Sequence, residues 1–115
     1  MLKASLEKKL QTMERRYIEL GALMSDPELM SNANLFREYG MEYAMLESIV
    51  IEYRTYKSIN DDIISAEEML HDDDPELKKL AYIECDQLKQ QLSDVVEKLR
   101  LMLVPKDPLD DSNVF

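Results

Sequence analysis

Few side chains in this sequence are of a type that does chemistry. The single histidine, His71, is followed at once by three carboxylates, Asp72, Asp73 and Asp74. A histidine beside a nucleophile can act as a general base, and clustered carboxylates can bind a divalent cation. No serine or cysteine nucleophile lies close to His71, and the aspartates lack the spaced ligands and turn glycine of a calcium loop. We interpret the four residues as an acidic, solvated helix end, and they are also candidates for a partner contact.

Other chemical motifs are missing from the sequence. It contains no glycine-rich phosphate loop, zinc pattern or nucleophile motif, and its basic residues are not interleaved with aromatic ones. The lone cysteine, Cys85, lies on an apolar stripe, where we expect a buried, inert thiol. Of the eight methionines, three on the apolar stripes, Met13, Met24 and Met102, are explained by gap filling, whereas exposed ones such as Met30 or Met41 are possible contact residues. We therefore expect an interaction domain with no enzymatic activity, cofactor or metal.

The elements that would position these residues are helices. In the first segment, steps of three and four place six apolar residues on one helical face: Leu6, Leu10, Met13, Tyr17, Leu20 and Met24. This stripe predicts a helix over residues 4–24, and Asp26-Pro27 predicts a break followed by a short helical turn at 27–31. A second helix, capped by Asn32 or Asn34, should run from about 34 to 71 and reach roughly 55 Å, so the domain should be elongated. Within it we interpret Gly40 as a packing position.

The third helix should begin at the acidic turn. Asp74 can cap it, and Pro75 suits its first turn. The tetrapeptide Asp-Pro-Glu-Leu, found at 26–29 and at 74–77, is shared capping chemistry rather than a repeat. An alternation of four and three predicts a seam against the second helix, formed by Ala81, Cys85, Leu88, Leu92, Val95, Leu99 and Met102. The predicted fold is all-α: an elongated three-helix bundle built on a long antiparallel helical hairpin, coiled-coil-like, with a short extra helical turn.

Composition and charge narrow the class of protein. The chain has 115 residues, of which 45% are hydrophobic and 33% charged, so we expect one helical domain. It has no apolar signal segment and no apolar run long enough to span a membrane, so we expect a cytoplasmic protein. The net charge of −10 disfavours a broad nucleic-acid surface and favours protein partners. Residues 1–24 nevertheless carry five basic and three acidic side chains, a net +2. Either this basic segment lies on acidic longer helices, which we favour, or its basic face is kept free for a partner.

The C-terminal residues carry a family resemblance. Residues 101–115 read Leu-Met-Leu-Val-Pro-Lys-Asp-Pro-Leu-Asp-Asp-Ser-Asn-Val-Phe. The core Leu-x-Pro-Lys-Asp-Pro, with Pro105, Lys106, Asp107 and Pro108, resembles the signature that ends the first domain of bacterial peptide chain release factor 1. It differs from the corresponding segment of release factor 2. The upstream order of helices agrees with that family, so the resemblance covers all 115 residues.

The resemblance implies a role in translation termination, in which the factor releases the nascent peptide at the stop codons UAA and UAG. The Pro-x-Thr tripeptide and the Gly-Gly-Gln loop that act in that family do not occur in this sequence. We therefore expect residues 1–104 to be the N-terminal helical domain and residues 105–115 to be a linker toward codon-recognition and catalytic domains. The final apolar pair, Val114-Phe115, fits a chain that is cut within a longer one.

The resemblance also implies partners. In that family the first domain faces the stalk base of the large ribosomal subunit, near protein L11, and is associated with the GTPase release factor 3. The turn from His71 to Pro75 lies at the far end of the predicted hairpin, roughly 43 Å from Pro105. We predict that either this turn or the side of the first helix touches the stalk base.

Two rival interpretations stay open at this point. A free-standing helical adaptor or a prefoldin-like coiled-coil chaperone subunit would use the same apolar stripes to dimerise or to hold clients, and monomeric sedimentation would count against it. A small enzyme with an unrecognised site would be active on ester or peptide substrates. Nothing in the sequence places a base beside a nucleophile, so we consider the enzyme the weaker of the two.

Overall fold

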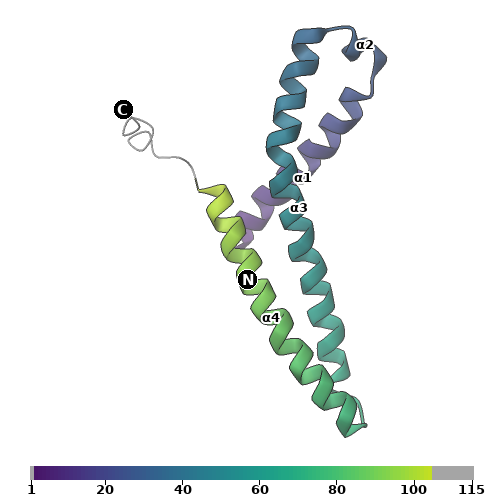
Figure 1. Cartoon of the computed structure of the whole chain (residues 1–115), viewed down its shortest axis with the longest axis vertical. Coiled ribbons are helices and arrows are strands. Elements are labelled where there is room, and N and C mark those ends of the chain that lie inside the picture. Colours follow the sequence, from purple (N-terminus) through teal and green to yellow (C-terminus); the bar gives the residue numbers. More distant parts are fainter. Residues whose placement is uncertain (1, 105–115) are drawn as a thin grey trace.

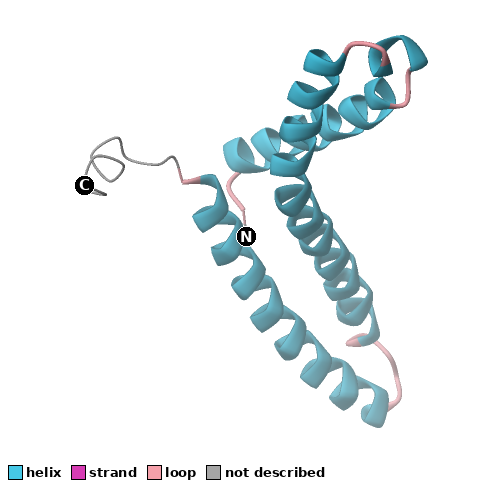
Figure 2. Ribbon diagram, turned by 45° about the horizontal axis from the view of Figure 1, so that its top comes forward, coloured by secondary structure: helices cyan, strands magenta, loops and turns pink. Residues whose placement is uncertain are grey.

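The computed structural model describes residues 2–104, and within them the chain forms four helices and no strand. These are α1 (Ala4–Met24), α2 (Pro27–Met30), α3 (Ala33–Met69) and α4 (Pro75–Leu103). Figure 2 shows that helices make up nearly all of the described chain, joined by short loops. The structure is therefore the predicted all-α bundle on an antiparallel α3–α4 hairpin. The predicted linker at 105–115, with Pro105, Lys106, Asp107 and Pro108, lies outside the described residues.

The helix ends follow the predicted capping chemistry. A side-chain oxygen of Asp26 accepts a hydrogen bond of 3.0 Å from the backbone N–H of Glu28, and Asp74 accepts one of the same length from Glu76. Both copies of Asp-Pro-Glu-Leu thus start a helix in the same way. Of the two candidate caps of α3, Asn32 does the capping, since its side-chain oxygen accepts from the N–H of Leu35 at 3.2 Å.

The central helix α3 packs with different sides against α1 and α4. Figure 1 shows α1 beside its N-terminal half and α4 beside its C-terminal half. The reason lies in the spacing of its buried residues. From Val50 through Tyr53 and Tyr56 to Ile59 the steps are all of three residues, and each such step falls about 60° short of a full turn. The buried stripe therefore moves about halfway around α3, which places its two partners on different sides.

All three long helices contribute to one core near the middle of α3. The buried side chains at this junction include Leu10 from α1, Tyr53 and Tyr56 from α3, and Val96 and Leu99 from α4. Each of these side chains is at most 5% exposed, and the two tyrosine rings stack with their centroids 6.2 Å apart. Burying such side chains away from water contributes about 1.5 to 3 kcal/mol apiece. This junction therefore fixes α1 and α4 on the same central helix.

The register of α4 differs from the prediction at two residues, Val95 and Met102. The predicted seam included Val95, but Val96 is the buried residue and Val95 is only half-buried. With Leu103, which packs against the core, the observed seam from Ala81 spans 22 residues in six steps, close to the 3.6 of a straight helix, whereas the predicted seam from Ala81 to Met102 has the 3.5 of a heptad. The prediction of Val95 was wrong because it assumed a strict heptad.

The α1–α3 contact contains both glycines of the chain. A Cβ on Gly40 would lie 3.7 Å from the Met24 side chain, and one on Gly21 would lie 3.5 Å from Tyr43. Both distances are ordinary van der Waals contacts, and neither glycine has a positive φ. Tyr43 also stacks on Tyr17, with ring centroids 4.3 Å apart. Gly40 therefore lies at a helix contact, as interpreted from the sequence, but this contact leaves room for a Cβ and does not require glycine.

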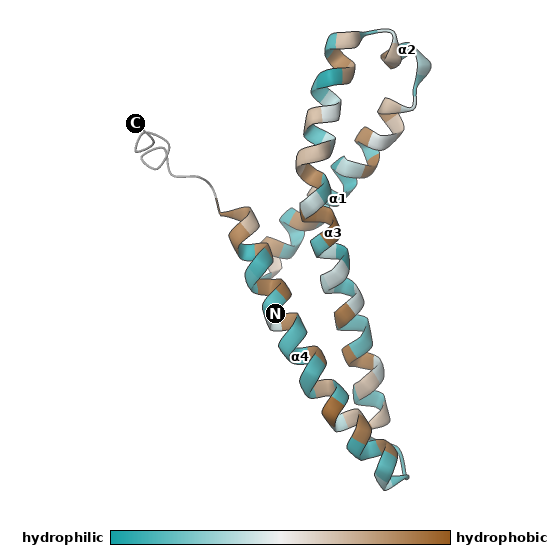
Figure 3. Cartoon of the chain, viewed as in Figure 1, coloured by the Kyte–Doolittle hydropathy of each residue, from teal (hydrophilic) through white to brown (hydrophobic). Residues whose placement is uncertain are grey.

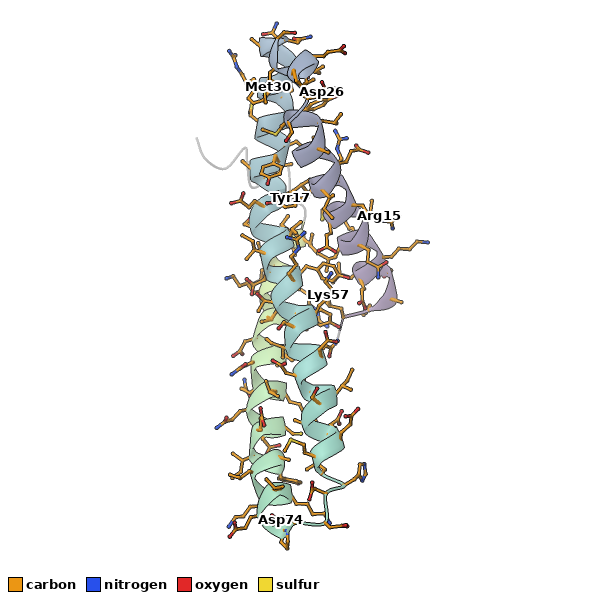
Figure 4. All side chains as sticks on the ribbon, turned by 90° about the vertical axis from the view of Figure 1, so that its right-hand side faces the viewer. Arg15, Tyr17, Asp26, Met30, Lys57 and Asp74 are labelled. Carbon is orange, nitrogen blue, oxygen red and sulfur yellow. The ribbon has the colours of Figure 1, made fainter. Side chains whose placement is uncertain are left out.

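The molecule is elongated. Its principal extents are 62 × 42 × 21 Å and its radius of gyration is 19.7 Å, against about 13 Å for a compact domain of this length. Figure 4 places Asp74 at one end of the molecule, and Asp26 and Met30 at the other. The turn between α3 and α4 and the connection between α1 and α3 therefore lie at opposite ends of the molecule. No helix within residues 2–104 is long and apolar enough to cross a membrane.

Candidate interaction surfaces

The turn between α3 and α4 forms one end of the molecule. Three consecutive backbone hydrogen bonds end α3. The last of them is donated by the N–H of Asp72 to the carbonyl of Met69 at 3.2 Å. A side-chain oxygen of Asp72 then accepts from the N–H of Asp74 at 2.9 Å, and Asp74 caps α4. Asp72 and Asp74 are therefore occupied in holding the turn.

The other two residues of the predicted contact are not occupied in this way. His71 and Asp73 are exposed, and neither side chain forms a hydrogen bond or ion pair within residues 2–104. The structure thus brings His71, Asp72, Asp73 and Asp74 together in one turn but divides them into two roles. A partner at this turn would meet the side chains of His71 and Asp73 most directly. No cluster of three or more residues that could hold a metal ion occurs in the described part of the chain.

The negative charge of the protein is concentrated at the same end. Residues 61–86, which comprise the end of α3, the turn and the start of α4, carry ten carboxylates and two lysines, a net −8. One cross-helix ion pair involves this region, from Lys89 to Glu67, with the charged atoms 3.9 Å apart. We call residues 61–86 the acidic tip. Its field favours cationic partners and repels anionic ones.

The α1–α3 contact is fastened by a carboxylate of α1. Glu14 lies between Arg54 and Lys57 of α3, with N–O distances of 2.8 and 2.9 Å. Burial acts to raise the pKa of Glu14, but the hydrogen bonds and charges of Lys57 and Arg54 outweigh it and lower that pKa below its usual range. Lys57 also lies 4.7 Å from the Tyr53 ring centroid, and Arg54 lies 5.7 Å from that of Tyr17. The two cations thus join the polar and aromatic parts of the contact.

A second group of charged side chains also joins α1 to α3, but here the cation lies on α1 and its cross-helix carboxylate lies on α3. Arg16 of α1 donates two hydrogen bonds, of 2.8 and 2.9 Å, to the carboxylate of Glu42 on α3 and also pairs with Glu19. The bond from Arg16 lowers the pKa of Glu42, outweighing the effect of burial. The Arg16 guanidinium also lies 5.6 Å from the Tyr39 ring centroid.

The net basic charge of the first segment is only partly matched by acidic partners. Arg16 is its one basic residue with an ion pair to α3; Lys3, Lys8, Lys9 and Arg15 are exposed and form none within residues 2–104. Figure 4 shows Arg15 pointing away from the two longer helices. The favoured explanation, a basic helix neutralised by acidic ones, therefore applies to Arg16 alone.

Exposed apolar side chains form a further surface that the sequence analysis missed. Leu80 and Ile83 on the outer side of α4, with Glu76 and Lys79, line a shallow groove of about 360 Å³. The signal was present in the sequence, since Leu80 and Ile83 fall outside the predicted seam. Met30 and Met41 are exposed, as expected for possible contact residues. Cys85 is buried in the α3–α4 core, as predicted.

The fold and these surfaces define a class of protein, an elongated all-α bundle with one strongly acidic end. Comparison with known families then identifies the chain more closely: the PCRF domain model matches residues 13–115. The chain belongs to the PCRF domain family, that of the peptide chain release factors, and this family acts in translation termination. No solved structure matches this chain. The family match favours the release factor interpretation over a free-standing adaptor or a prefoldin-like subunit.

Proposed function

We propose that this chain is the N-terminal helical domain of a factor of the release factor 1 type. In that role it serves a protein that releases nascent peptides at UAA and UAG, while other parts of the factor read the codon and position the attacking water. The family match over residues 13–115 is the observation that carries this proposal. The Pro105–Pro108 segment supports the type 1 branch, because its Pro-Lys-Asp-Pro sequence resembles the type 1 signature.

The domain itself acts as an interaction module without catalytic activity. Its partner site is the stalk base of the large ribosomal subunit, near protein L11, and the GTPase release factor 3 acts through the same domain. The length of the α3–α4 hairpin supports this role, since α4 holds the acidic turn about 43 Å from its C-terminal end. Electrostatic attraction between the acidic tip and a basic protein surface would speed docking.

Charge reversal at Asp73 tests the docking proposal. Asp73 is exposed and forms no bond in the turn, so Asp73→Lys leaves the caps at Asp72 and Asp74 intact. Binding of the 115-residue chain to large ribosomal subunits, measured by co-sedimentation, should weaken in this variant and on subunits that lack protein L11. The matched control is Glu28→Lys, an equal charge reversal at the opposite end of the molecule, which should bind normally. Equal binding by both variants would reject docking through the tip.

Two further experiments test the identity of the factor. Reading the coding sequence beyond Phe115 should reveal an in-frame continuation with Gly-Gly-Gln, and the factor so encoded should release peptide on UAG but not on UGA. An equal response to both codons would reject the type 1 branch. The purified 115-residue chain should not hydrolyse ester or peptide substrates; activity there would overturn its role as a non-catalytic module.

A further inference from the structure

The start of α4 exposes apolar side chains on the side that faces away from α3. Leu80 and Ile83 are 62% and 48% exposed, and they line the groove of about 360 Å³ together with Glu76 and Lys79. Residues 76, 79, 80 and 83 have the spacing of one helical face, so the groove runs along the helix for about 10 Å. Figure 3 shows apolar and polar residues alternating along this part of α4. Because α3 packs on the other side of α4, the groove has no occupant within residues 2–104.

The surroundings of the groove are strongly acidic. It lies inside the acidic tip, whose net charge is −8, and Glu76 is part of its lining. Lys78 and Lys79 are the two cations of this region, and Glu84 and Asp86 follow them on α4. An apolar ligand with a net negative charge would be repelled, whereas a ligand with flanking cations would be attracted.

We propose that this groove binds an amphipathic helix of a partner protein, with an apolar stripe against Leu80 and Ile83 and with lysines or arginines facing the surrounding carboxylates. A helix fits because its side-chain ridges pack between the ridges of α4, and such grooves accept anchors at helical spacing. The strong negative charge argues against a second copy of this chain as the occupant, because two acidic tips repel each other. The proposal rests on the surface of α4 and not on the proposed function, so each can fail without the other.

The probe is a designed helical peptide of about 15 residues with leucines on one face and lysines on the flanks. Its affinity for the 115-residue chain is measured by fluorescence anisotropy. The variant Leu80→Ser/Ile83→Ser should bind the peptide about tenfold more weakly or worse, because two apolar contacts are lost. Both residues are exposed, so the variant should keep its helical circular dichroism. The matched control, Met41→Ser/Met45→Ser, removes two similarly exposed apolar side chains from α3 outside the acidic tip and should bind normally.

Charge is tested on both sides of the interface. A peptide with glutamate in place of lysine should bind about tenfold more weakly or worse, and raising the salt from about 50 to about 300 mM should weaken the lysine peptide. Equal affinity of the Leu80→Ser/Ile83→Ser variant and the control variant would overturn the groove as the site. Equal affinity for both peptides would overturn the cationic partner, and self-association of the chain that the Leu80→Ser/Ile83→Ser variant abolishes would assign the groove to a second copy. Peptide binding without ribosome docking would reject the proposed function alone.

Discussion

Glu14 is the less exposed of the two carboxylates that form ion pairs between α1 and α3, so its removal should loosen that contact measurably. Its side chain is 17% exposed, and it pairs with Arg54 and Lys57, whose side chains are 49% and 44% exposed. Half-exposed cations are screened by water, so each pair contributes about 0.5 kcal/mol rather than the larger value of a buried pair. The Glu14→Gln substitution keeps the size of the side chain but removes its charge. It should therefore lower the free energy of unfolding by about 1 kcal/mol.

The effect of this variant should depend on pH. The pKa of Glu14 is lower in the folded chain than its ordinary value of 4.5. The stabilisation is thus present above about pH 4.5 and is lost as the pH falls through the folded pKa. The difference between the wild type and Glu14→Gln should be largest at about pH 7 and should be smaller at about pH 3, where the stabilisation begins to be lost.

Urea unfolding followed by circular dichroism at both pH values measures this difference. At neutral pH the thermal midpoint should also fall by about 4 °C. The control is Glu97→Gln, which removes an exposed carboxylate paired within α4 to Arg100 at 3.9 Å and should change stability by about 0.3 kcal/mol or less. A Glu14→Gln effect that is the same at both pH values would refute the ion-pair explanation, and a variant as stable as wild type would refute the contact itself.

Four further substitutions test the core, the register of α4 and the space beside Gly40. Leu99→Ala, at a side chain that is 0% exposed where three helices meet, should lower the free energy of unfolding in urea by about 3 kcal/mol; a change within error would contradict the junction. Val96→Ala should cost about 1.5 kcal/mol and clearly more than Val95→Ala, and the reverse order would contradict the observed register. Gly40→Ala should raise the thermal midpoint, since alanine gains up to about 1 kcal/mol in a helix and its Cβ would meet only Met24 at 3.7 Å; destabilisation would show that this space is not available.

The sequence by itself determined the helices and their ends. Apolar spacing located the three long helices to within two residues at each end, and the two Asp-Pro-Glu-Leu segments marked where α2 and α4 begin. These signals are local: a cap bonds to a backbone N–H two or three residues away, and a helical stripe is visible in one segment alone. The elongated shape followed as well, because the length of a helix is proportional to its number of residues.

Only the tertiary structure decided which side chains the helices share. The three successive three-residue spacings between apolar residues of α3, from Val50 to Ile59, were visible in the sequence. They did not predict that α1 and α4 pack on the two different faces of α3 that this spacing produces. The choice of Val96 over Val95 and the exposure of Leu80 and Ile83 likewise depend on where the partner helix lies. Within the acidic turn, the structure separated Asp72, which holds the turn, from Asp73, which is free to meet a partner. Packing between helices depends on contacts between residues that are distant in the chain. The apolar pattern within one segment therefore cannot predict which of its side chains those contacts bury.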